Sequence, residues 1–201
     1  MIAIIDYGAG NIFSVKNALD YLGLENALVS DVQSVKDADA VILPGVGAFP
    51  AAMEKLNATG LVDTIKEEAR RKPFLGICLG MQLIFEKGYE FEECDGLGLI
   101  SGSVRKMEEP DLIIPHMGWN ELEKLNDCPL MEGIGDSEYV YFVHSYKAFC
   151  DDSNISAYVE YGGRVPALVF DGNYVYGCQF HPEKSGDTGL KILRSFASLI
   201  K

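Results

Sequence analysis

The segment PFLGICLG, residues 73–80, decides the fold because it joins a buried strand directly to a helix. Its first half is a short apolar run, which predicts a strand, and residues 79–86 predict a helix that closes at Gly88. Gly76 and Gly80 stand on either side of Cys78, and glycine relieves the crowding of a sharp turn. The segment therefore predicts a strand, a tight turn and a helix, with a thiol on the turn.

The same alternation of strands and helices extends through the first half of the chain. Strands are expected at 1–5, 27–29 and 40–43, and helices at 12–22, 51–56 and 61–71. After about residue 96 the apolar runs become short or alternating, at 98–104, 139–146, 155–161, 165–170 and 174–180, before a last helix that begins near Asp187 and Thr188. The pattern predicts an α/β fold: a doubly wound, mostly parallel sheet of the flavodoxin-like kind, with a β-rich second half.

Composition limits the class of protein. The 201 residues are 48% hydrophobic without a break in composition, so we expect one domain over residues 1–201. The formal net charge of −13 argues against nucleic acid as a partner. The longest apolar runs fall far short of the roughly 20 residues of a membrane span, and the N-terminus lacks the features of a secretory signal. A cytoplasmic protein without a membrane partner is predicted.

Cysteine and histidine usage argues against metal sites and disulfides. The five cysteines are odd in number, widely spaced and without a C-x-x-C pair, so neither a disulfide framework nor a zinc site is expected. The three histidines have no cysteine or carboxylate at metal-ligand spacing. We expect no metal and no cofactor, and we interpret His116 and His144 as structural or interface residues.

Three motifs together point to nucleophilic catalysis. Cys78, at a strand-to-helix turn, would feel the helix dipole, which favours the thiolate. His181 and Glu183 follow a predicted strand, so the imidazole could accept the thiol proton while the carboxylate orients the ring. Taken singly, a buried structural cysteine and a solvated His-Glu loop remain the alternatives. A glycine-rich turn at 44–47 supplies backbone N–H groups near Val46 and Gly47 that, with the amide of Leu79, suit an oxyanion hole.

Together, residues 44–47 (PGVG), 76–82 (GICLGMQ) and 181–184 (HPEK) resemble the class I, or triad, glutamine amidotransferases along nearly the whole chain. Within that superfamily, residues 6–11 (DYGAGN), 115–120 (PHMGWN) and 141–146 (YFVHSY) resemble the glutaminase subunit of imidazole glycerol phosphate synthase. The resemblance implies that Cys78 is the nucleophile, His181 the general acid and base, and Glu183 the orienting acid. It implies hydrolysis of glutamine to glutamate and ammonia.

The resemblance also implies further residues and a partner. Glutamine would be held by Gly45, Gln82, Ser145 and Tyr146, and the partner would be the (βα)8-barrel cyclase subunit of the synthase, facing Trp119, Tyr141 and Lys184. The cyclase would use the ammonia to make imidazole glycerol phosphate and aminoimidazole carboxamide ribotide in histidine biosynthesis.

Several alternatives stay open on the sequence alone. Met81 stands where anthranilate-type subunits usually carry His, and the Gly-Gly-Glu-Ser-Thr segment of pyridoxal phosphate synthase glutaminases is missing, so these branches are less favoured. A free-standing cysteine hydrolase of the same fold would need no partner, and a redox or binding module would need no His181. Dinucleotide binding at residues 8–13 is disfavoured because Phe13 replaces the third glycine.

Overall fold

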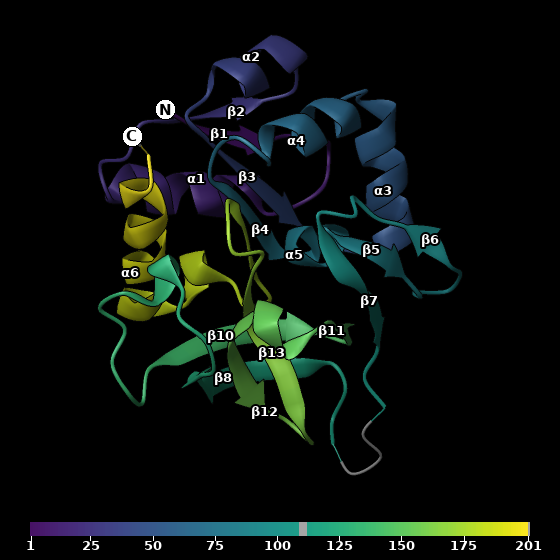
Figure 1. Cartoon of the computed structure of the whole chain (residues 1–201), viewed down its shortest axis with the longest axis vertical. Coiled ribbons are helices and arrows are strands. Elements are labelled where there is room, and N and C mark those ends of the chain that lie inside the picture. The colour runs from purple at the N-terminus through teal and green to yellow at the C-terminus, as the bar shows by residue number, and fades with distance from the viewer. Residues whose placement is uncertain (109–111, 201) are drawn as a thin grey trace.

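The computed structural model of the chain describes residues 1–108 and 112–200, and its main feature is an eight-stranded sheet (Figure 1). The strands lie in the order β2 (Asn26–Val29), β1 (Ile2–Ile5), β3 (Ala40–Gly45), β4 (Phe74–Cys78), β14 (Val175–Cys178), β13 (Arg164–Phe170), β12 (Ile155–Glu160) and β9 (Glu123–Lys124). The first five are parallel and the last three join them antiparallel. The predicted α/β class and mostly parallel sheet are confirmed.

Helices cover both faces of this sheet. Alternate side chains of β1 point to opposite faces, so Ile2 and Ile4 join one core while Ala3 and Ile5 join another. The first core is covered by α1 (Ile12–Tyr21) and α6 (Gly186–Ser198), and the second by α2 (Val32–Asp37), α3 (Phe49–Ala58) and α4 (Val62–Glu68). Figure 1 shows α1 and α6 together on one side and α3 and α4 on the other. The strands are therefore buried on both faces, as their unbroken apolar runs indicate.

Two smaller sheets carry the rest of the β-structure. One has the order β11 (Tyr146–Phe149), β7 (Ile100–Lys106), β5 (Phe85–Gly88) and β6 (Cys94–Asp95). The other is a two-stranded ribbon of β8 (His116–Glu121) and β10 (Tyr139–His144). Short 3₁₀ turns occur at Pro129–Met131, Asp152–Asn154 and Pro182–Lys184. The β-rich second half thus folds partly into the main sheet and partly beside it.

Several element boundaries differ from the sequence prediction. The helix after Cys78, α5 (Leu79–Leu83), ends early because the next residues form β5, which pairs with β7. Helix α2 was not predicted, although Asp31 caps it by accepting a hydrogen bond from the backbone of Ser34. Strand β8 was also missed, and α6 begins at Gly186 rather than at Asp187 or Thr188. Tertiary pairing overrides local helical spacing in the first case.

Strand register brings three predicted motifs to one edge of the main sheet. Gly45 at the end of β3 is the register partner of Cys78 at the end of β4, and β14, which precedes His181, pairs with β4 on its other side. Open α/β sheets place their sites at this carboxyl edge. Within residues 1–108 and 112–200, no helix is long and apolar enough to cross a membrane.

Candidate active site

The turn at Cys78 has the strained geometry of a nucleophile elbow. Cys78 has φ +55° and ψ −112°, outside the regions that non-glycine residues prefer, at a cost on the order of 1–3 kcal/mol. Beyond it, the backbone of Gly80 approaches β3 so closely that a Cβ there would lie 1.8 Å from the carbonyl oxygen of Leu43. Only glycine permits this approach. The sharp turn lifts the thiol above the sheet edge, where it lies almost buried.

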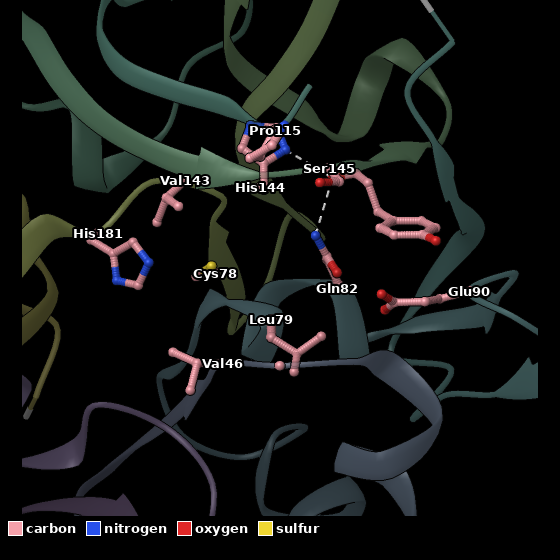
Figure 2. A pocket seen from close by; sticks show the side chains of 12 residues that line it. Val46, Cys78, Leu79, Gln82, Glu90, Pro115, Val143, His144, Ser145 and His181 are labelled. Atoms are coloured by element: carbon pink, nitrogen blue, oxygen red, sulfur yellow. Dashed lines mark hydrogen bonds between the residues drawn. The ribbon is translucent and has the colours of Figure 1, made fainter. Parts of the chain in front are cut away.

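His181 and Glu183 form a buried ion pair beside this thiol. The ring nitrogen Nδ1 of His181 lies 2.8 Å from Oε1 of Glu183, whose side chain is only 1% exposed. The backbone N–H of His181 donates to the carbonyl oxygen of Tyr141, which fixes the backbone position from which the ring projects. The other ring nitrogen, Nε2, has no hydrogen bond of standard geometry to a described atom. It is available to Cys78, which lies on the same side of the cavity (Figure 2).

The electrostatics of this trio favour a charged histidine. Burial lowers the pKa of His181, but hydrogen bonding and attraction to Cys78 and Glu183 outweigh burial and raise the pKa to about 10. An imidazolium in this position places a positive charge next to the Cys78 sulfur. Helix α5 has only five residues, so the field of its dipole at Cys78 is weaker than that of the helix predicted over residues 79–86.

A cavity of about 320 Å³ opens over Cys78. It is lined by Val46, Gly47, Cys78, Leu79, Gln82, Glu90, Pro115, Val143, His144, Ser145, Tyr146 and His181. The lining brings together residues from the ends of the parallel strands, from α5 and from the β8–β10 ribbon (Figure 2). This combination of a concave site, a strained thiol and a perturbed histidine is the usual signature of an active site.

The structure places most predicted site residues around this cavity. Gly47, with φ +101°, lies in the left-handed region that favours glycine, and it lines the cavity together with Val46 and Leu79. Gly45 does not line the cavity but lies below it, beside Cys78 in the sheet. The predicted partner-facing residues lie outside: Trp119 is 53% exposed, its ring makes an edge contact with Tyr141, and Lys184 is exposed. Their roles stay predictions.

Comparison with known proteins agrees with this geometry. Residues 3–199 match the glutamine amidotransferase class-I family. The chain belongs to this family.

Relatives of this amidotransferase point to one branch. The imidazole glycerol phosphate synthase subunit HisH of Bacillus thuringiensis (strain Al Hakam) is 52% identical over 202 residues, covering 100% of this chain and 96% of that protein. HisH of Bacillus cereus (strain 03BB102) matches at the same level. Solved structures share the fold: a glutamine amidotransferase has a TM-score of 0.77 at 22% identity, covering 100% of this chain and 99% of that one. PurLQS from Thermotoga maritima has a TM-score of 0.77 at 23% identity, covering 100% and 98%.

Gln82 of the amidotransferase is held in one orientation. Its Nε2 donates to the carbonyl oxygen of Tyr146 at 3.1 Å and to Oε1 of Gln179 at 3.0 Å. Both amide hydrogens are therefore used, and only Oε1 can accept a hydrogen bond from a ligand. A substrate group that contacts this side chain must be a donor, such as an amide NH₂ or an ammonium.

Sequence reasoning missed a carboxylate in the cavity wall. Glu90 lines the cavity, and its Oε2 accepts a 2.8 Å hydrogen bond from the backbone N–H of Phe49, in the first turn of α3. It therefore ties the wall to the helix that follows the Val46–Gly47 loop, and it brings negative charge close to a ligand. No spacing motif marks Glu90, because it lies in a loop that only the folded chain brings to the site.

Pro115, Val143 and His144 were also not predicted to line the cavity. His144 was interpreted as a structural or interface residue, and its contact with the cavity depends on how the β8–β10 ribbon lies. Among residues 1–108 and 112–200, no three His, Cys, Asp or Glu side chains are arranged to hold a metal ion.

Proposed function

We propose that this chain is the glutaminase subunit of an imidazole glycerol phosphate synthase, and that one domain over its whole length hydrolyses glutamine. The observation that carries the proposal is the Cys78 thiol on a strained turn, next to the buried His181–Glu183 pair, in one cavity. Identity of 52% with HisH proteins over the whole chain favours this branch over the anthranilate and pyridoxal phosphate branches.

The cavity suits glutamine because its polar groups match both ends of an amino acid amide. The carboxylate of Glu90 attracts an α-ammonium group, and Gln82 Oε1 and the backbone of Ser145 and Tyr146 supply hydrogen-bonding groups along the wall. The side-chain amide then lies toward Cys78.

The reaction proceeds through a thioester. The Cys78 sulfur attacks the amide carbon, and backbone N–H groups of Val46 or Gly47 and of Leu79 stabilise the oxyanion. His181 gives its proton to the departing nitrogen, so ammonia leaves and the acyl group stays on sulfur. His181 then accepts a proton from water, which attacks the thioester and releases glutamate with the thiol restored. Glu183 keeps the ring in place and stabilises the imidazolium.

The ammonia acceptor binds on another subunit in this proposal. Glutamine fills the cavity during the reaction, and the sequence shows no phosphate-binding motif for a nucleotide acceptor. The partner is the (βα)8-barrel cyclase subunit, which would contact Trp119, Tyr141 and Lys184 and use the ammonia to form imidazole glycerol phosphate and aminoimidazole carboxamide ribotide. A cytoplasmic location remains a prediction.

The test is glutamate release from glutamine by the purified chain, alone and with a cyclase subunit that carries its nucleotide ligand. We expect strong stimulation by the cyclase, a loss of roughly 10⁴-fold in Cys78→Ala, and intact synthesis by that variant when ammonia is supplied. Cys78-dependent hydrolysis that ignores the cyclase would place the chain in another branch. Absence of Cys78-dependent hydrolysis in every mixture would refute the enzyme.

A further inference from the structure

Two buried histidines lie next to the site without a part in the chemistry above. His116 on β8 and His144 on β10 are register partners in the ribbon and are 1% and 6% exposed. An imidazole buried this deeply destabilises a fold unless its nitrogens are hydrogen-bonded. The partners of these two rings therefore show what the pair does.

The histidines form a hydrogen-bonded chain that ends at the glutamine cavity. Asn120 Oδ1 lies 2.8 Å from Nε2 of His116, whose Nδ1 lies 3.1 Å from Nε2 of His144. Nδ1 of His144 lies 2.8 Å from the carbonyl oxygen of Tyr146, in the cavity wall. The ring of His116 is fixed between those of Phe142 and Tyr161, with centroids 4.8 and 3.9 Å away.

The chain continues from Tyr146 to the nucleophile. The same carbonyl oxygen accepts from Gln82, whose second amide hydrogen goes to Gln179 Oε1. The Nε2 of Gln179 in turn lies 4.0 Å from the sulfur of Cys78, and Gln179 is fully buried. Figure 2 draws the bonds from Gln82 and His144 as dashed lines that meet at the cavity wall.

The direction of each proton follows from the Tyr146 carbonyl, which can only accept. His144 must carry its proton on Nδ1, and burial lowers its pKa to about 3, so the ring is uncharged and Nε2 is an acceptor. His116 must then donate from Nδ1, which leaves its Nε2 as an acceptor, so the Asn120 side chain must turn its NH₂ group rather than Oδ1 toward this nitrogen. At the other end, Gln179 must present its oxygen to Gln82, because turning its amide would place two donors face to face.

We propose that His116 and His144 are positioning residues for glutamine hydrolysis: they fix the Tyr146 carbonyl and, through Gln82, the Gln179 amide below the nucleophile. This inference rests on the proposed glutaminase function. The series of hydrogen bonds begins on β8, the strand that carries the exposed side chains of Met117 and Trp119. A shift of that strand therefore changes hydrogen bonds at the glutamine cavity. The groups are contiguous, and their coupling is a measurable quantity.

The first experiment compares His144→Leu with His144→Asn in the complex with the liganded cyclase. The Asn side-chain NH₂ can replace Nδ1 as donor to Tyr146, whereas Leu, of similar size, cannot. We expect Leu to raise KM for glutamine about tenfold or more with a smaller change in kcat, and Asn to bring KM back to within about threefold of wild type. Active-site titration with a glutamine-analogue affinity label corrects for any inactive fraction.

A purely structural role gives a different result. Both variants would then lose active protein, which lowers the rate per milligram but leaves KM unchanged after titration. Tyr161→Phe is the matched control, because it keeps the ring against His116. It removes only the hydrogen bond from the hydroxyl to the carbonyl oxygen of Ile113, which is not part of the hydrogen-bonded series from Asn120 to Cys78. Its KM should equal that of wild type. Equal KM in the Leu variant and wild type would overturn the proposal.

A double-mutant cycle tests whether the chain is continuous. His116→Phe keeps the stacked ring and removes its hydrogen bonds, and Gln179→Met keeps volume and removes the amide. If the groups act together, the double variant loses less kcat/KM than the product of the two single losses, by about threefold or more. A loss of kcat/KM in the double variant equal to the product of the two single losses would show that the residues act independently, and it would refute the proposed coupling.

The tautomer supplies a readout independent of turnover. Nitrogen NMR of the labelled protein in the complex should show His144 uncharged at neutral pH with its proton on Nδ1. A proton on Nε2 would refute the assigned hydrogen-bond directions. Failure of this inference is distinct from failure of the proposed function. A wild-type complex without glutaminase activity refutes the function, whereas an active wild type with unaffected His144→Leu refutes the positioning role alone.

Discussion

Gly45 and Cys78 are register partners on the parallel strands β3 and β4, so the glycine-rich loop and the turn at Cys78 leave the sheet side by side. This register sets the separation between the sulfur and the N–H groups proposed for the oxyanion. Gly80 keeps the turn tight enough for this to hold, because its backbone lies against Leu43 of β3.

The first prediction concerns that contact. Gly80→Ala would place a Cβ 1.8 Å from the carbonyl oxygen of Leu43, and neither backbone can yield without breaking the β3–β4 pairing. We expect a loss of at least ~2 kcal/mol in the free energy of unfolding, measured by urea denaturation. Gly135→Ala is the control, since the nearest atom to its Cβ would be Glu138 Oε1 at 3.9 Å. Equal stability of the two variants would contradict the prediction.

The second prediction concerns the pH dependence set by Glu183. Its charge helps to raise the pKa of His181 to about 10, so the His181 ring stays protonated, as the proposed general acid requires, until alkaline pH. Glu183→Gln keeps an acceptor near Nδ1 but removes the charge, which lowers the pKa of His181. The alkaline limb of kcat/KM should move from near pH 10 toward neutrality, and kcat should fall by roughly 100-fold or more.

An exposed carboxylate provides the control for this profile. Asp187→Asn removes a charge nearby in the chain without contact to the ring. Its pH profile should match that of wild type. A limb that stays near pH 10 in Glu183→Gln would mean that another group titrates there.

The third prediction concerns substrate charge. Glu90→Gln keeps an acceptor for the Phe49 N–H but removes the negative charge from the cavity wall. We expect KM for glutamine to rise about tenfold or more with little change in kcat, because the lost attraction acts equally on substrate and transition state. Steady-state kinetics of the complex measure this, with the exposed Glu92→Gln as the control. A fall in kcat alone would assign Glu90 to loop positioning instead.

The fourth prediction concerns acid stability. Burial lowers the pKa of His144 to about 3, whereas the unfolded chain has the ordinary value near 6.5, so between these values the unfolded state binds more protons. Stability from the uncharged ring is complete above pH 6.5 and falls as pH decreases, by up to about 1.4 kcal/mol per pH unit. Urea denaturation of wild type and His144→Asn from pH 7.5 to 4.5 should show a shallower decline in the variant. Parallel curves would contradict this assignment.

The proposed triad of Cys78, His181 and Glu183 was accessible to sequence reasoning because each part lies in a short local motif. The flanking glycines, Gly76 and Gly80, indicate the sharp turn at Cys78, and His181 and Glu183 are two residues apart. Strand alternation then predicted that both motifs reach one sheet edge, and the register of β3, β4 and β14 shows that they do.

Glu90, His144 and Gln179 were not accessible in this way. Each reaches the site through pairing between segments far apart in sequence, and none lies in a motif whose spacing indicates its contacts. The same cause explains the early end of α5, since the pairing of β5 with β7 outweighs the helical spacing of residues 79–86. Only α2 was missed despite a local signal, the Asp31 cap.

Strand β14 is the last of the parallel strands and pairs antiparallel with β13, so the site depends on a strand from late in the sequence. Cys78 is synthesised early, but β14, which leads into His181, pairs with β4 only after about a hundred more residues have left the ribosome. Such distant pairing makes assembly of the site a late step of folding. We expect nascent chains that already contain Cys78 to lack amidase activity, so that free ammonia is not released before translation has passed His181.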